Sequence, residues 1–408
     1  MSEEFKRVEV KKYGIVFLRT KRFLPVMDRL GKNGVSKPVG WFLLYLMPVI
    51  AGLGLFVFLS TFLVIFSSTA HQVGVNVRAV TPLAYLGLPG LNPYLPIADG
   101  WLAIFFAMVV HEGAHGIVAR SLGLPVKDSG LFFFLFIPLG AFVNLDEDAL
   151  RQARARDSGR VFAAGAGVNF LFGILFLILL FNVVATMTPA ANGIGIGSVA
   201  VSSPASSAGI KAGDFITAVN GVHYNDPSAI PQSSWYKPGQ NVTMTIWDSG
   251  RTEQINMTLG HNPNNTTEAF IGVETIGYSD LQSRVSTYTG SIFSQPIRYV
   301  CIPTFPNCEG FAPFSGSLAP FYTSSYGGSL TTLATILYWF FFINISLAIT
   351  NALPIFPLDG GQAFAAGLSG AFKGRLSEKW IINITAIVTM LVIVLIAGLP
   401  VSAYLGLI

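Results

Sequence analysis

Charged residues are scarce in this chain of 408 residues. Asp, Glu, Lys and Arg make up 11% of the sequence and hydrophobic residues 52%, whereas an ordinary soluble domain is about 25% charged. This composition excludes a wholly soluble protein and predicts a polytopic α-helical membrane protein with at least one soluble portion. The small net charge of +4 arises from segments beside the apolar runs, so we expect the lipid bilayer as a partner and no nucleic acid.

Cysteine is rarer still. The sequence contains two, Cys301 and Cys308, seven positions apart in one polar segment. The pair has two interpretations: a disulfide that closes a short loop on an oxidising, extracytoplasmic side of the membrane, or two free thiols. We favour the disulfide.

Apolar runs long enough to cross a bilayer occur at five places, since a spanning helix takes about 20 residues. They cover residues 39–66, 100–121, 161–188, 331–352 and 380–408. A further apolar stretch, residues 130–143, is too short to span and contains a proline and glycines. We therefore predict about five spans plus a re-entrant or surface-lying hairpin.

Lysine and arginine are unevenly distributed among the connecting segments. Residues 1–38 contain ten, residues 120–160 six and residues 353–379 three, whereas residues 67–99 contain one. The long segment 189–329 contains five, against eight acidic residues. The positive-inside rule predicts a multi-pass plasma-membrane protein with a cytoplasmic N-terminus and an extracytoplasmic long segment. The first residues show no apolar core followed by a cleavage site, so we expect no cleavable signal peptide.

Two of the five histidines lie in the second apolar run. His111 and His115 are four residues apart, so on a helix they share one face and both imidazoles can reach one zinc ion. Glu112 is placed to take a proton from a metal-bound water. Ionisable groups in spans are costly and usually mark function, although a five-residue pattern with two free positions also arises by chance.

A catalytic zinc site needs a third protein ligand. The remaining histidines, His71, His223 and His261, fall in the predicted outer segments and cannot reach membrane depth. Asp359 is the only carboxylate between residues 315 and 376, and it follows a proline-containing break that can turn the chain back to the depth of the histidines. The alternative for Asp359 is a helix cap or turn residue near the inner surface.

Three stretches resemble the site-2 protease family of intramembrane zinc metalloproteases, which is peptidase M50-like. They are His-Glu-Gly-Ala-His at 111–115, Gly-Ala-Gly-Val-Asn at 165–169, and the segment 351–360 with its Leu-Asp-Gly core. Their order and placement in the spans also resemble the family, and the resemblance covers residues from about 100 to 365.

The resemblance implies an intramembrane zinc metalloendopeptidase that cleaves a transmembrane helix of a single-span membrane protein. It implies His111, His115 and Asp359 as zinc ligands and Glu112 as the catalytic acid/base. Residues 130–143 would offer an edge strand to the unwound substrate, or are a plain packing element. The rival functions are a non-proteolytic zinc-containing scaffold or chaperone and a transporter; few spans and no internal repeat disfavour the transporter.

Two asparagines belong to the resembling segments. Asn169 lies near the site in such enzymes, where it would hold a substrate carbonyl or the developing oxyanion. Alternatively, it makes an interhelical hydrogen bond, with Gly165 and Gly167 allowing close approach of the helices. Asn351 has similar alternatives, a structural or substrate-positioning role. Ala166 departs from the commoner bacterial form of the family, which often has proline at this position. The departure leaves the assignment to the family intact.

The soluble portion begins near residue 194 and resembles a PDZ domain. The resemblance rests on Ser-Pro-Ala, Ala-Gly, Ala-Gly-Asp and Val-Asn-Gly, spaced through residues 197–221. We predict a helical turn at 205–208 and strands at 215–219, 242–247 and 253–259. Such a domain captures a peptide by strand addition, or stands over the active site and excludes substrates with a large outer part; we favour exclusion.

These observations divide the chain into five parts. In order, they are a basic cytoplasmic segment (1–38), a first membrane part (39–188), an extracytoplasmic PDZ-like domain (189–275), an extracytoplasmic cysteine-containing segment (276–330) and a second membrane part (331–408).

Overall fold

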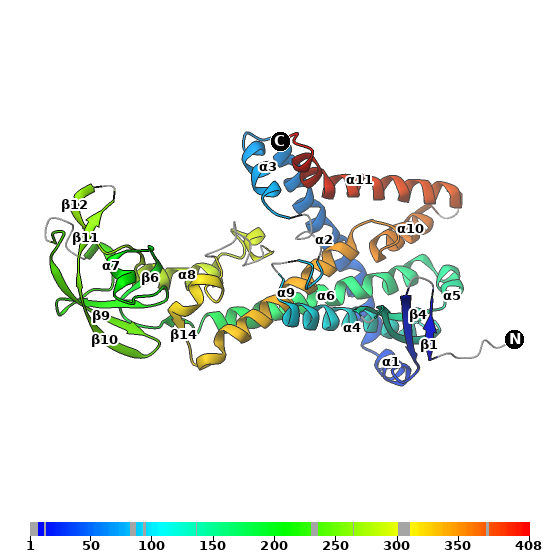
Figure 1. Cartoon of the computed structure of the whole chain (residues 1–408). Helices are drawn as coiled ribbons and strands as arrows, with labels where there is room; N and C mark the ends of the chain where they lie inside the picture. Colours follow the sequence, from blue (N-terminus) through cyan, green and yellow to red (C-terminus); the bar gives the residue numbers. More distant parts are fainter. Residues whose placement is uncertain are drawn as a thin grey trace. The chain divides into compact units, whose positions relative to one another are not determined.

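The structure is a computed structural model, shown in Figure 1. It describes residues 7–11, 14–81, 87–92, 95–135, 137–229, 236–263, 265–300, 311–372 and 375–408. The chain forms two compact units: the first comprises Met1–Phe176 and Trp339–Ile408, and the second Leu177–Tyr338. Cys301 and Cys308 lie outside the described residues, so their pairing stays a prediction.

Five long apolar helices within the described ranges confirm the predicted polytopic helical membrane protein. They are α2 (Ser36–Leu63, continued by the 3-10 turn Val64–Phe66), α4 (Ile97–Ser121), α6 (Ala155–Val184), α9 (Leu330–Ala352) and α11 (Glu378–Tyr404). Each contains an 18-residue window whose mean hydropathy lies between 1.6 and 2.7. Large apolar side chains are exposed on α2 and α11, as a lipid-facing surface requires.

Helix α6 begins earlier than the predicted run, which started at residue 161. Asp157 lies in its first turn and pairs with Arg154 and Arg160 at 2.8 and 3.3 Å. An acidic side chain is favourable at a helix N-terminus, and its two ion pairs let the helix extend through a charged stretch.

Shorter helices of the first unit flank these spans. They are α1 (Leu24–Gly31), α3 (Ala70–Arg78), α5 (Glu147–Gln152) and α10 (Asp359–Phe372). Helix α1 approaches α4 closely because a side chain is missing at Gly116: a Cβ there would lie 2.7 Å from Sδ of Met27 and 3.4 Å from Cγ1 of Val143. At Gly116 the helix that carries His111 therefore lies close to both α1 and Val143.

The first unit also contains a four-stranded antiparallel sheet. Its strands are β1 (Val8–Val10), β2 (Ile15–Thr20), β3 (Val126–Phe134) and β4 (Ile137–Leu145), in the order β1-β2-β3-β4. The predicted hairpin at 130–143 is thus present as β3–β4, and the N-terminal segment forms strands that pair with it. Phe17 stands opposite Phe132 in register, with ring centroids 6.0 Å apart, a stabilising cross-strand pair.

One buried arginine joins α2 to α6. The guanidinium of Arg160 donates to the carbonyl of Lys37 over 2.8 Å and lies 5.0 Å from the ring centre of Trp41. Together with its ion pair to Asp157, these contacts compensate a charge that is only 4% exposed. The start of α2 is thereby fixed beside the start of α6.

The second unit is mainly antiparallel β-structure, as predicted. Its main sheet has the order β10-β9-β7-β6-β13, with β8 pairing with β7. The strands of the unit are β5 (Thr188–Pro189), β6 (Ile194–Val199), β7 (Phe215–Val219), β8 (Val222–His223), β9 (Asn241–Asp248), β10 (Arg251–Thr258), β11 (Gly260–Asn262), β12 (Asn265–Phe270), β13 (Val273–Ile276) and β14 (Tyr322–Thr323). The three predicted strands correspond to β7, β9 and β10, each within a residue or two at its ends.

Turns and helices of the second unit follow local sequence signals. Asn220 and Gly221 have positive φ angles of 50° and 82°, which a two-residue hairpin turn requires and this Asn-Gly pair readily adopts. Helix α7 (Pro204–Ser207) begins where the Ser203 hydroxyl accepts from the N–H of Ser206. Helix α8 (Tyr278–Gly290) packs on a cluster of tyrosines and phenylalanines. Burial raises the pKa of the Tyr288 hydroxyl in that cluster well above its usual range.

Candidate metal centre and active site

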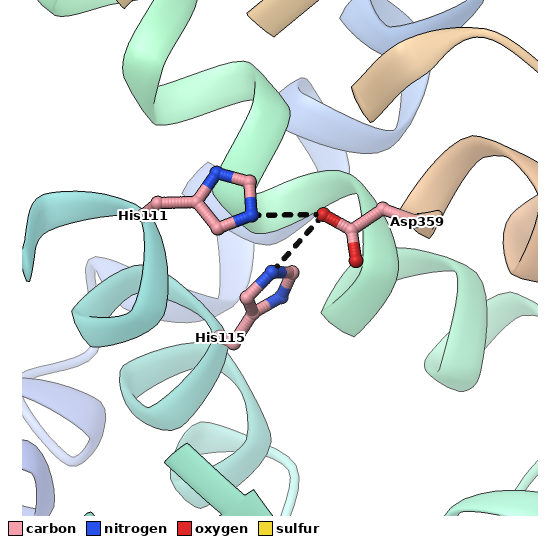
Figure 2. Close-up of side chains that lie close together, drawn as sticks. All are labelled: His111, His115 and Asp359. Atoms are coloured by element: carbon pink, nitrogen blue, oxygen red, sulfur yellow. Dashed lines mark ion pairs between the residues drawn. The ribbon is translucent and has the colours of Figure 1, made fainter. Parts of the chain in front are cut away.

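Three side chains from two distant parts of the sequence meet inside the first unit. One oxygen of Asp359, Oδ2, lies 3.1 Å from Nε2 of His111 and 3.1 Å from Nε2 of His115 (Figure 2). Their side chains are only 9%, 8% and 14% exposed. The structure therefore places Asp359 beside the paired imidazoles and not at the surface.

Helix α10 delivers the carboxylate because the preceding turn is unusually tight. Asp359 is the first residue of α10, seven positions after α9 ends at Ala352. A Cβ at Gly360 would collide with the carbonyl oxygens of Leu353 and Ala352, and one at Gly361 would lie 2.5 Å from the backbone of Ile355. The two glycines after the aspartate thus allow the chain to fold back on the end of α9.

Helix α6 approaches the imidazoles at Gly165. A Cβ at this position would collide with Nε2 of His115 and would lie 2.6 Å from Nε2 of His111. The absence of a side chain is what leaves room for the ring nitrogens and for anything bound to them.

Each histidine is held through its other ring nitrogen. Nδ1 of His115 lies 2.7 Å from the carbonyl oxygen of Val161, and Nδ1 of His111 lies 3.3 Å from Nδ2 of Asn169. Both contacts come from α6, and both turn Nε2 toward Asp359. Groups that orient a histidine from behind are characteristic of metal sites.

The donor set fits a zinc ion. Two imidazole nitrogens and a carboxylate are ligands of catalytic zinc, whose bonds of about 2.0–2.2 Å separate tetrahedral ligands by about 3.3 Å, close to the observed 3.1 Å. Oδ2 of Asp359 is buried and has no hydrogen-bond partner among the described residues. A bound cation would offset the free-energy cost of burying this charged oxygen. Among the residues described, the cluster offers three atoms that could bind a metal, whereas tetrahedral zinc takes four ligands, so a zinc ion held here would have one position left for water or substrate.

Glu112 lies beside this cluster and contacts the sheet. Its Oε2 accepts a hydrogen bond of 2.9 Å from the backbone N–H of Val143 in β4. Because that N–H donates to Glu112, it points away from the neighbouring strand β3. The edge of β4 therefore faces the helix that carries the histidines.

The remaining sequence candidates lie in different surroundings. Asn351, in the last turn of α9, donates to the carbonyl of Leu347 in its own helix over 3.1 Å. Asn169 is fully buried against His111. The roles of the backbone carbonyl of Val161 and the backbone N–H of Val143 are not evident from the sequence, because every residue type other than proline has the same peptide groups.

Comparison with known proteins extends these observations. Residues 100–396 match the model of peptidase family M50. This chain belongs to that family. Family M50 consists of zinc metalloproteases, and its match together with the His-His-Asp cluster identifies zinc as the cofactor.

Individual proteins are also similar to parts of the chain. An uncharacterized protein of Methanocaldococcus jannaschii is 31% identical over 220 residues, 53% of this chain and 56% of that protein. A candidate zinc metalloprotease of Nostoc sp. is 24% identical over 295 residues, 62% of this chain and 81% of that protein. A DegP-like periplasmic serine endoprotease of Brucella suis is 44% identical over 62 residues, 15% of this chain and 12% of that protein. The chain thus spans about half the length of the first relative.

The space beside the two imidazoles depends on the missing side chain at Gly165. Gly165→Ala places a methyl group against both ring nitrogens, so we expect the purified protein to lose most of its zinc, from about one ion per chain. Gly113→Ala is the matched control, because a Cβ at this position of the same histidine motif meets nothing within 4 Å. Metal analysis of both variants measures the effect, and equal zinc contents would contradict this view of the site.

Proposed function

We propose that this M50 protein is an intramembrane zinc metalloendopeptidase that cleaves a transmembrane helix of a membrane-anchored substrate, with His111, His115 and Asp359 as zinc ligands. One observation carries the proposal: a three-ligand cluster is buried among apolar spans with Glu112 beside it. A scaffold with structural zinc would want four protein ligands, so the open position favours catalysis.

Glu112 is the acid/base of the proposed reaction. Zinc, when bound, supplies a Lewis acid that lowers the pKa of water and polarises a carbonyl. Glu112 accepts a proton from the attacking water and delivers it to the leaving amine nitrogen. Since the N–H of Val143 holds Oε2, the other carboxylate oxygen is the one that accepts this proton.

Strand β4 is the proposed contact for the substrate backbone. A peptide bond within an intact helix is shielded, so cleavage requires local unwinding. Among the described strands β4 pairs only with β3, so no strand occupies its other edge, where the N–H of Val143 bonds to Glu112 and an added strand would use the neighbouring backbone groups. A segment bound along this edge would lie next to Glu112, which supports strand addition over a plain packing role for the hairpin.

Substitution of Glu112 tests the catalytic role. Glu112→Gln keeps the size of the side chain but cannot accept the proton, so we expect normal zinc content and a rate lower by about 100- to 10,000-fold. Asp359→Ala should lower zinc content and activity together. Cleavage of a tagged single-span substrate, with and without a chelator, measures these rates. Normal cleavage by Glu112→Gln would remove it as the base, and no cleavage by the wild-type protein under any condition would favour the scaffold.

The β-rich second unit is proposed to act as a filter on the extracytoplasmic side. The short match to a DegP-like protease supports its resemblance to a PDZ domain. We expect the wild-type enzyme to cleave a substrate trimmed to a short outer tail and to spare the same substrate carrying a folded outer domain. If the second unit instead binds a specific peptide, a free peptide with the sequence of the substrate's outer tail would inhibit cleavage competitively. Competition by that peptide, with equal cleavage of both substrates, would exclude the filter.

We further propose that the N-terminus is cytoplasmic and the second unit extracytoplasmic, in the plasma membrane. Two exposed arginines allow a matched test: Arg22 precedes α1, and Arg251 begins β10. In a chain lacking Cys301 and Cys308, a membrane-impermeant maleimide should label Arg251→Cys in intact cells and Arg22→Cys only after permeabilisation. The reverse pattern would invert the topology.

A further inference from the structure

Three positions on one face of α6 line the metal cluster. Val161, Gly165 and Asn169 are spaced four residues apart, which places them on the same side of a helix. Val161 contacts His115, Gly165 leaves room for both rings, and Asn169 contacts His111. This face therefore supplies the groups behind the imidazoles.

The partner of His115 defines which of its nitrogens carries the proton. A carbonyl oxygen can only accept, so at 2.7 Å from the oxygen of Val161 the Nδ1 of His115 must be the donor. The neutral ring then has its lone pair on Nε2, the nitrogen that faces Asp359. His115 is thus held in the form that binds a metal.

Asn169 stands in the corresponding position behind His111. Its Nδ2 lies 3.3 Å from Nδ1 of His111, whereas its Oδ1 is buried without a hydrogen-bond partner among the described residues. An amide that donates to Nδ1 would leave the proton of a neutral ring on Nε2, where it would block a metal. A half-turn of the amide group exchanges its oxygen and nitrogen in nearly the same volume. The oxygen then faces Nδ1 of His111, and the NH2 group takes the position that has no partner among the described residues.

We propose that Asn169 is a positioning residue whose amide oxygen accepts the Nδ1 proton of His111. That bond selects the ring form whose Nε2 is free for zinc, as Val161 does for His115. The contact is made at Nδ1 of His111, the ring nitrogen turned away from Asp359 (Figure 2). Orienting the ring from this side is a different role from holding a substrate oxyanion. The inference rests on the proposed metal site, though not on which peptide bond is cut.

Two variants at residue 169 distinguish a role as hydrogen-bond acceptor from a role as hydrogen-bond donor and from a role in packing. Asn169→Asp retains an acceptor and cannot donate when ionised, while Asn169→Leu fills a similar volume with neither. Asn344→Leu is the matched control. Asn344 is also fully buried in a span, and its Oδ1 has no partner in the described part of the chain, but its amide donates to the carbonyl of Phe340 in its own helix. The control measures what the loss of any buried amide costs.

The measurement is zinc affinity of the purified full-length chain, by competition with a chromogenic chelator, with thermal melting recorded alongside. We expect Asn169→Leu to weaken zinc binding by roughly 10- to 100-fold. Asn169→Asp should bind within about threefold of wild type, because a carboxylate behind a histidine is an equally good acceptor. Asn344→Leu should leave the affinity unchanged.

Several results would overturn the proposal. Loss of affinity in Asn169→Asp would mean that the amide N–H is needed, and wild-type affinity in Asn169→Leu would mean that no bond from Asn169 matters. If Asn169→Leu fails to fold, Asn169→Asp alone decides. If the wild-type protein binds zinc but does not cleave, the proposed peptidase activity is refuted and the test of Asn169 still applies. If the wild-type protein binds no zinc, both proposals are overturned.

Discussion

The structure depends on placing two imidazoles and a carboxylate together within apolar helices. An isolated carboxylate at such depth would cost several kcal/mol, roughly, unless it is neutralised or paired. Asp359 meets both histidines through a single oxygen, so one cation can compensate it and receive three ligands at once. The glycines at 165, 360 and 361 are consequences of this constraint, because each removes a side chain that would keep the three groups apart.

Backbone groups orient two side chains of the candidate site. The carbonyl of Val161 orients His115, and the N–H of Val143 holds Glu112. A peptide group cannot change its rotamer, so it fixes a functional side chain more firmly than another side chain would. The two histidines of the cluster and the glutamate lie on one helix, yet their orientation depends on two other segments, α6 and β4.

Much of this arrangement is predictable from sequence because hydropathy, helical spacing and membrane depth are local or additive properties. They predict the five spans, the shared face of His111 and His115, and Asp359 as the carboxylate that lies close to them. The pairing of the N-terminal strands with the hairpin is not predictable in this way, since Phe17 and Phe132 are distant in sequence and nothing local specifies their register. The contact between Glu112 and β4 follows from that sheet, and it escapes prediction for the same reason.

The two edges of the sheet differ in a way that bears on function. Exposed edges invite unwanted pairing, and proteins usually shorten or charge them. Strand β1 follows this rule, with three residues and an ion pair between Glu9 and Arg19. Strand β4 has nine residues, and β3 holds it through Asp128, which bonds Asn144 as well as Arg19. A long edge strand beside Glu112 favours unwanted pairing in a protein that binds no extended chain, but it is useful in a protein that does bind one. For this reason we interpret the sheet and the metal cluster as parts of one site.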